Sequence, residues 1–364
     1  MATQAAQRRG ARLLVVSNMW PSSRHPVFGG FVSRNVDALR ECGATVDVVA
    51  NTDARTGVLR GTLKYVRLAR DARRQARASD YDAVIGHYLY PTAGMAAAAA
   101  RAAGARLVLV VHGTDSRSVH RTDPWAYAAR RAVRSADLVV TVSRALARAV
   151  REGLKLSDDV PVAVVHMGID EEVFVPDPSA RNALDVPAHE RVVLYVGNLA
   201  RTKGLDVLQT AFQALVADGT ADRLVVVGGG QLEAELREWA DGDPQLRDRV
   251  VMTGRIEQGE VARWMAAADT LVLPSRNEGL GLVLIEAMAC GTPCVASRVG
   301  GIPEVVRDDT GILVPPDDPA ALASALAQVL ERGRSSYHEA CIRAARGHGS
   351  RDKAKEMLDA IAQL

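Results

Sequence analysis

The sequence predicts an α/β protein with two doubly wound domains, and three observations support this. Apolar runs of about six residues, the length of a buried parallel strand, alternate with amphipathic helical stretches along most of the chain. A polar stretch with three prolines, residues 168–187, interrupts the alternation, which then begins again. A length of 364 residues, with 48% apolar and 24% charged residues, is typical of two ordinary globular domains.

Each expected strand is an apolar run bounded by glycine, proline or a polar residue. In the first series the expected strands are 12–17, 45–50, 82–87, 106–111, 137–142 and 160–165. In the second series they are 191–197, 223–228, 249–254, 270–275, 292–297 and 311–316. We therefore expect an N-terminal domain over residues 1–174, a C-terminal domain over 175–345 and a C-terminal helix over 346–364.

Composition also bears on location and cofactors. The chain has no run of about 18 apolar residues and no long apolar segment before its first strand, so we expect neither a spanning helix nor secretion. The four cysteines, Cys42, Cys290, Cys294 and Cys341, show neither a paired framework nor metal-ligand spacing. We expect a cytoplasmic protein with reduced thiols and no metal or other cofactor.

Positive charge is concentrated in the N-terminal part of the chain. Residues 1–174 contain 25 Lys/Arg and 16 Asp/Glu, a net charge of +9, and the remaining residues contain 20 and 27, a net charge of −7. Part of the excess recurs at helical spacing on one face, at Arg60, Lys64, Arg67, Arg74 and Arg77. Such a stripe is either a solvated helix face or a contact for an anionic membrane surface. Nucleic acid is not expected, because aromatic residues do not interleave with the basic ones.

Residues 274–291 form the most informative segment, which predicts a strand, a glycine loop and a helix that ends before Gly291. Its loop lies at the carboxyl end of a parallel strand, where open α/β sheets bind ligands. Glu278 lies in this loop, and Glu286 lies in an otherwise apolar helix, where a buried charge is costly without a partner. Two glutamates near a helix start can also simply favour the helix dipole. As ligand-binding groups, carboxylates suit sugar hydroxyls.

Other phosphate-binding patterns do not fit. The sequence GGGQLE has Glu233 where a dinucleotide fingerprint needs its third glycine, and GNLARTKG is not a Walker loop. The two Asp-x-Asp pairs, at residues 80–82 and 241–243, do not follow strands. We expect Lys203 to open the helix after the seventh strand, where a positive charge works against the helix dipole and is more easily explained by a bound anion.

Several motifs resemble those of retaining GT4-type glycosyltransferases: NEGLGLVLIEAMACGTPCVAS, GGIPEVV, YVGNLARTKGLDVL, VHMGIDEEVF, HPVFGGFVSRNVDAL and VHGTD. The resemblance covers nearly the whole chain and is strongest over residues 190–330. The resemblance implies a GT-B fold, with two Rossmann-like domains facing across a cleft. It also implies that the C-terminal helix crosses back to the first domain.

The resemblance also implies roles for individual residues. It gives catalytic roles to Lys203, Glu278 and His112. The donor-binding residues that it implies are Gly29, Gly30, Arg201, Gly228, Arg255, Ile256, Leu280, Gly281, Leu282 and Glu286. His87 and Asp115 are expected near the acceptor. The chain departs from the family at Asn198, where arginine is common, and at Leu280, where phenylalanine is common.

The function implied is metal-independent, retaining transfer of a hexosyl unit from a nucleotide-diphosphate sugar to a hydroxyl acceptor. A lipid-linked acceptor would place the protein on the inner face of the plasma membrane, in cell-envelope polysaccharide or glycolipid synthesis. A small soluble acceptor is the first alternative. A sugar-nucleotide epimerase or phosphorylase, and a non-catalytic sugar-nucleotide binding protein, are the others.

Overall fold

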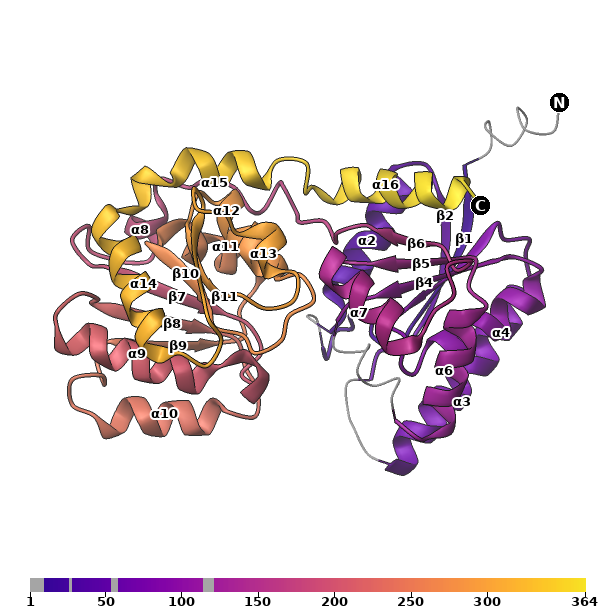
Figure 1. Cartoon of the computed structure of the whole chain (residues 1–364), viewed down its shortest axis with the longest axis horizontal. Helices are drawn as coiled ribbons and strands as arrows, with labels where there is room; N and C mark the ends of the chain where they lie inside the picture. Colours follow the sequence, from indigo (N-terminus) through magenta and orange to yellow (C-terminus); the bar gives the residue numbers. More distant parts are fainter. Residues whose placement is uncertain (1–9, 26–27, 54–57, 114–120) are drawn as a thin grey trace. The chain divides into compact units, whose positions relative to one another are not determined.

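The computed structural model describes residues 10–25, 28–53, 58–113 and 121–364, with the backbone alone for residues 58–62. The chain divides into two compact units (Figure 1). Unit 1 comprises Met1–Gly168 together with Ser350–Leu364, and unit 2 comprises Ile169–Gly349. Each unit is built around a parallel sheet of six strands, so the predicted fold class of two doubly wound α/β domains is confirmed.

Unit 1 has the strand order β2-β1-β3-β4-β5-β6. Its strands are β1 (Arg12–Ser17), β2 (Thr45–Ala50), β3 (Ala83–His87), β4 (Arg106–Val111), β5 (Leu138–Thr141) and β6 (Val162–Val164). Its helices are α2 (Gly30–Glu41), α3 (Val58–Ala76), α4 (Ala93–Ala103), α6 (Pro124–Arg134), α7 (Arg144–Leu154) and α16 (Ser350–Ala362). Most of the residues in the central strands are fully buried, as the unbroken apolar runs predict for a sheet covered on both faces.

The last helix of the chain belongs to the core of unit 1. Its buried residues Ala354, Met357 and Ile361 recur at helical spacing and join the apolar cluster formed by the strands and α2. Figure 1 shows α16 beside α2 and the strand ends of this unit, and the two helices are in contact. The arginine-rich helix α3 instead packs on α4, which in turn contacts α6.

Unit 2 has the strand order β12-β11-β10-β7-β8-β9. Its strands are β7 (Val192–Val196), β8 (Arg223–Val227), β9 (Val250–Gly254), β10 (Thr270–Leu273), β11 (Cys294–Ser297) and β12 (Gly311–Val314). Its α-helices are α8 (Ala180–Ala183), α9 (Leu205–Ala217), α10 (Glu233–Gly242), α11 (Gln258–Ala267), α12 (Leu282–Ala289), α13 (Ile302–Val305), α14 (Pro319–Arg332) and α15 (His338–Ala345). Helices α9 and α14 pack on each other, as do α12 and α15.

Both sheets reverse their strand order at one point. In unit 1 the first strand, β1, lies between β2 and β3, and in unit 2 the first strand, β7, lies between β8 and β10. Consecutive loops leave the sheet in opposite directions at such a point, so a crevice opens outside the carboxyl ends of the two central strands. Ligand binding is therefore expected at the ends of β1 and β3, and at those of β7 and β10.

Candidate functional site

In unit 2, a lysine and a glutamate meet at this switch point. Lys203 follows β7 and Glu278 follows β10, so the sheet brings together two residues that are 75 positions apart. Nζ of Lys203 lies 2.6 Å from Oε2 of Glu278, and the two side chains are 24% and 18% exposed. The pair is thus largely shielded from water, and an anion that approaches Lys203 has to compete with Glu278.

The local structure around Lys203 differs from the expectation that this residue opens a helix. Arg201–Lys203 is a separate 3₁₀ turn, and α9 begins only at Leu205. The two elements are separated by Gly204, which adopts a left-handed conformation and packs against the backbone of Pro274. Lys203 therefore lies before the helix, where the amino group reaches towards the loop that follows β10.

Arg276 ties the two loops together, a role that the sequence patterns did not indicate. Its backbone N–H donates to the carbonyl of Thr202 at 2.9 Å, and its guanidinium donates to the carbonyl of Arg201 at 2.7 Å. The same guanidinium forms a two-pronged contact with Asp206 at 2.7 and 2.8 Å. These hydrogen bonds hold the loop that carries Lys203 against the loop that carries Glu278.

Three further residues that sequence reasoning missed lie around Glu278. The hydroxyl of Ser275 donates to Oε2 of Glu278 at 3.3 Å. Tyr195, on β7, is fully buried, and burial together with the negative charge of Glu278 raises the pKa of its phenol. Gly300 packs against the backbone of Glu278 so closely that a Cβ there would collide with it. The one sequence signal available was Ser275 itself, a hydroxyl three residues before a glutamate in the loop.

The expected donor-binding residues after β10 surround the start of α12. Gly281 precedes this helix with a φ of 88°, and Leu280 beside it is buried. Leu282 is half-buried at the first helical position, and Glu286 is half-buried one turn further on. Among the described residues, no side chain caps the helix, so its first backbone N–H groups remain available to a ligand.

The remaining expected donor residues lie at the ends of β7, β8 and β9. Arg201 is exposed and lies 3.7 Å from Glu235, and the exposed Arg255 extends over Gly229. Gly228 has a packing role, because a Cβ there would collide with the backbone of Gly197, which follows β7. The half-buried Ile256 and the exposed Asn198 were also singled out in the sequence.

In unit 1, the expected residues follow β1, β3 and β4. Gly29 precedes α2 with a φ of 78° and packs against Met19, and Gly30 is the first residue of that helix. His87 ends β3, and His112 follows β4, so the two histidines become neighbours at the carboxyl edge of the sheet. Asp115 lies outside the described residues.

The two imidazoles contact each other through ring nitrogens, with their centroids 5.3 Å apart. Nδ1 of His87 lies 3.1 Å from Nε2 of His112, and the rings are nearly parallel, with an interplanar angle of 15°. Phe31 packs edge-on to His112 at 5.0 Å between ring centroids, and Tyr88 contacts the same ring at 4.6 Å. The backbone of Tyr88 has a φ of 69°, a conformation that residues other than glycine rarely adopt. Such strained residues occur often at functional sites.

Burial makes the positive form of either histidine unfavourable. It lowers the pKa of His87 to about 4, and together with repulsion from a charged His87 it lowers the pKa of His112 well below its ordinary value. Both rings are therefore neutral at pH 7. A neutral imidazole donates one hydrogen bond and accepts another, which suits contact with a hydroxyl group.

The same unit also has a polar pocket, beyond the ends of β1 and β2. It has a volume of about 340 Å³ and is lined by Ser22, Ser23, Arg24, His25, Thr52 and Asp53. Hydroxyl, cationic and carboxylate groups converge there. The pocket is thus suited to a small molecule with both hydroxyl groups and negative charge.

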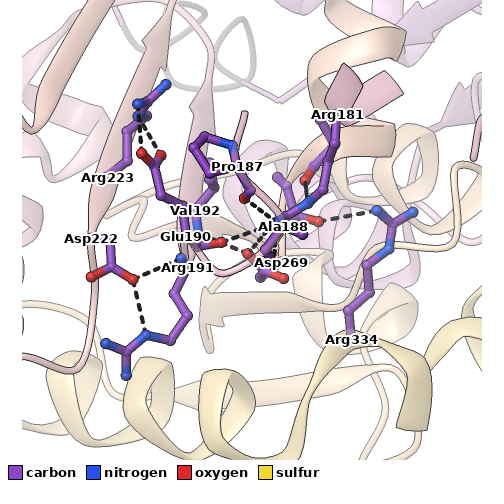
Figure 2. A network of polar contacts seen from close by, with 12 residues as sticks. Arg181, Pro187, Ala188, Glu190, Arg191, Val192, Asp222, Arg223, Asp269 and Arg334 are labelled. Carbon is purple, nitrogen blue, oxygen red and sulfur yellow. Dashed lines mark hydrogen bonds and ion pairs between the residues drawn. The ribbon is translucent and has the colours of Figure 1, made fainter. Parts of the chain in front are cut away.

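A second charged cluster lies at the opposite edge of the unit 2 sheet, and its charged groups bind one another and the backbone (Figure 2). At the amino ends of the strands, Asp269 accepts hydrogen bonds from Arg181 at 2.6 Å and from the backbone N–H of Val192 at 2.8 Å. Arg181 also donates to four backbone carbonyls, and Arg223 pairs with Glu190. These charged groups pair with one another and form hydrogen bonds with the backbone, so the cluster fixes the segment before β7 to the sheet.

Comparison with known proteins agrees with this geometry. Residues 2–173 match the family model described as Glycosyltransferase Family 4, and residues 190–332 match the model described as Glycosyl transferases group 1. The chain is 30% identical over 279 residues to the N-acetyl-alpha-D-glucosaminyl L-malate synthase of Bacillus anthracis, with 72% of each chain covered. The chain belongs to glycosyltransferase family 4.

Another relative in the family is the D-inositol 3-phosphate glycosyltransferase of Xylanimonas cellulosilytica, 38% identical over 250 residues. That match covers 62% of this chain and 58% of the relative, so the chain spans little more than half of that protein. A sucrose-phosphate synthase from Thermosynechococcus elongatus has the same fold, with a TM-score of 0.72, 23% identity and coverage of 98% and 97%. Its likeness confirms the GT-B fold of this family member.

Proposed function

We propose that the chain is a retaining glycosyltransferase that moves a hexosyl unit from a nucleotide-diphosphate sugar to a hydroxyl acceptor. The observation that carries the proposal is the contact between Lys203 and Glu278 at the switch point of unit 2. A shielded ammonium group suits a diphosphate, and the adjacent carboxylate suits sugar hydroxyls. Both curated relatives compared above bear the names of sugar-transferring or sugar-joining enzymes, which supports the assignment.

In this proposal the donor binds unit 2. Lys203 and Arg201 stabilise the departing diphosphate, while Glu278 binds the transferred sugar and Glu286 binds the ribose. The leaving phosphate accepts the proton of the acceptor hydroxyl on the same face of the sugar, so configuration is retained. Catalysis then rests on positioning and on electrostatic stabilisation of the leaving group. A structure of Anabaena Alr3699/HepE, which has the same fold at a TM-score of 0.76, contains UDP-glucose, and this supports a nucleotide-sugar donor here.

We further propose that protein cations replace a metal in this reaction. Transfer should then persist in excess EDTA, measured as release of nucleoside diphosphate from UDP-, GDP-, ADP- and dTDP-sugars. Complete loss that Mn²⁺ or Mg²⁺ restores would contradict the proposal. Nuclear magnetic resonance of the product decides retention, because the anomeric configuration of the new bond must equal that of the donor.

The acceptor is proposed to be anionic and to bind unit 1. Arg24 and His25 line the pocket beyond β1 and β2, and hydroxyls of the same pocket can hold a polyol. The two curated relatives are named for inositol 3-phosphate and for malate, which are both anions with a hydroxyl group. Initial rates with these two acceptors, in wild type and in Arg24→Gln, test the assignment. Equal acceptor KM values in the two proteins would contradict it.

A membrane surface is proposed as a second anionic partner, on the face formed by α3 and α6. There Leu63 and Val66 are 59% and 53% exposed, and a groove of about 720 Å³ passes beside Trp125. The arginines that line this groove are Arg70, Arg73, Arg74 and Arg77. Exposed apolar groups among arginines favour an anionic bilayer.

This α3 surface is not the stripe expected from spacing alone. Lys64 is half-buried and donates to the carbonyl of Asp53 at 3.3 Å, and the side chain of Arg60 lies outside the described residues. Within the part of the chain that the structure describes, no helix has the length and apolar character needed to span a bilayer. Any membrane contact proposed here is therefore peripheral.

Co-sedimentation with vesicles that contain anionic lipid tests the α3 surface. Each arginine near such a surface contributes about 1 kcal/mol, so Arg70, Arg74 and Arg77 changed together to Gln should release most of the bound protein at low salt. The matched control changes three exposed arginines of unit 2, Arg237, Arg247 and Arg332, to Gln. Equal binding by both triple variants, or no binding by wild type, would mean that the surface is only solvated.

A further inference from the structure

The contact between His87 and His112 restricts which ring nitrogens can carry a hydrogen. Only one hydrogen can lie between Nδ1 of His87 and Nε2 of His112 at a separation of 3.1 Å. Because both rings are neutral, one nitrogen donates and the other accepts. Two tautomer combinations are therefore possible, and they differ in which nitrogen of His112 carries its hydrogen.

The other nitrogen of His87 distinguishes the two combinations. His87 is fully buried, and its Nε2 has no hydrogen-bond partner among the described residues. If His112 donated to Nδ1 of His87, then His87 would carry its hydrogen on Nε2 and would bury an N–H group without an acceptor. Orphaned buried N–H groups are rarer in proteins than acceptors with unused lone pairs. For His87, the arrangement that leaves no buried N–H group without an acceptor has its Nδ1–H as the donor.

We infer that His87 is a positioning residue, which donates its Nδ1–H to Nε2 of His112 and thereby holds His112 in the Nδ1–H tautomer. Nε2 of His112 is then occupied as an acceptor, so this nitrogen cannot serve as a general base. In this tautomer Nδ1 of His112 carries the hydrogen, so His112 acts as the donor in any hydrogen bond at that nitrogen. The role of His112 towards the sugar rests on the proposed function, whereas the tautomer follows from the contacts within unit 1.

The packing around the pair makes the geometry specific. Phe31 from α2 and Tyr88 after β3 contact the ring of His112 and leave little freedom for it to turn. Loss of the hydrogen bond would therefore change the tautomer before it changed the ring position. Asparagine tests this directly, because its side-chain N–H₂ occupies nearly the place of Nδ1 in histidine. Leucine has similar bulk and no donor.

The first experiment reads the tautomer without any substrate. Two-bond ¹H–¹⁵N spectra of protein with ¹⁵N-labelled histidine, recorded at pH 7, separate the Nδ1–H and Nε2–H forms. The His112 signals are assigned from their absence in His112→Gln. We expect the Nδ1–H form in wild type and in His87→Asn, and a mixture of both forms in His87→Leu. An Nε2–H form in wild type, or an unchanged tautomer in His87→Leu, would overturn the inference.

The second experiment separates positioning from folding. In His87→Leu we expect kcat/KM to fall about 10- to 100-fold, the loss typical when the partner that orients a functional histidine is removed. His87→Asn should recover most of this activity, while its thermal midpoint resembles that of His87→Leu. Equal activity losses in the two variants would assign His87 a merely structural role and overturn the inference. Wild-type protein without any transfer activity would contradict the proposed function but leave the tautomer result intact.

Discussion

Replacement of Glu278 by glutamine should tighten the binding of a nucleoside diphosphate while it slows sugar transfer. In the ligand-free protein Glu278 holds Lys203 at 2.6 Å, and both side chains are more than three quarters buried. A diphosphate at Lys203 must displace this contact. The substitution Glu278→Gln keeps the shape and the hydrogen bond but removes the competing negative charge.

The size of the effect follows from the strength of the contact. A hydrogen bond between charged groups stabilises a protein by about 1.5–3 kcal/mol net, and a neutral partner gives roughly half of that. The substitution therefore releases about 1 kcal/mol, which corresponds to a Kd for the nucleoside diphosphate that is roughly fivefold lower. The kcat should fall, because the carboxylate is proposed to bind the transferred sugar.

Isothermal titration calorimetry with UDP, GDP, ADP and dTDP measures the first quantity, in wild type and in Glu278→Gln. Glu238→Gln, which neutralises an exposed carboxylate on α10, is the matched control and should leave the Kd unchanged. A double-mutant cycle with Lys203→Ala isolates the coupling, since the gain in affinity must vanish without the lysine. Weaker binding by Glu278→Gln than by wild type would refute the reasoning, because Glu278 would then support Lys203 in the complex.

Three further predictions concern single residues, and each names its measurement. Lys203→Ala should lower kcat/KM about 100-fold or more, since it removes a charge that acts on the leaving group, and steady-state kinetics with the best donor measure this. Glu286→Gln should raise the donor KM more than it lowers kcat; kinetic profiles identical to those of Glu278→Gln would contradict the division of roles. Asp269→Asn should destabilise unit 2 by about 3 kcal/mol, because it leaves the half-buried guanidinium of Arg181 without its charged partner. Calorimetric unfolding measures this loss, and an unchanged unfolding midpoint would contradict the prediction.

The pH dependence of stability is a further prediction for unit 1. The pKa of His87 is about 4 in the folded protein, whereas an unfolded histidine titrates near pH 6.5. The unfolded state therefore binds more protons between these values, and stability is lost as the pH falls through them, by up to roughly 3 kcal/mol. Thermal unfolding at pH 7.5 and pH 5 measures the loss, which His87→Asn should reduce. An equal pH dependence in the variant would contradict the assignment to His87.

The strands and the ends of strands could be predicted from local patterns. Unbroken apolar runs such as 106–111 specify buried strands, because only a sheet covered on both faces tolerates them. The same patterns place His87 at the end of a strand, His112 directly after a strand and Glu278 in the loop that follows a strand. They do not specify how neighbouring loops fold, so Lys203 was expected in a helix although it lies in a 3₁₀ turn.

The sequence by itself thus determined the fold class and the set of residues that lie at the carboxyl edges of the two sheets. The tertiary structure alone decided which of them meet. Lys203 contacts Glu278 because β7 and β10 are neighbours, and strand order depends on packing between distant segments that hydrophobic periodicity does not record. The same reason applies to the pairing of His87 with His112 and to the ties that Arg276 makes, since these contacts form only after long-range packing has set the sheet.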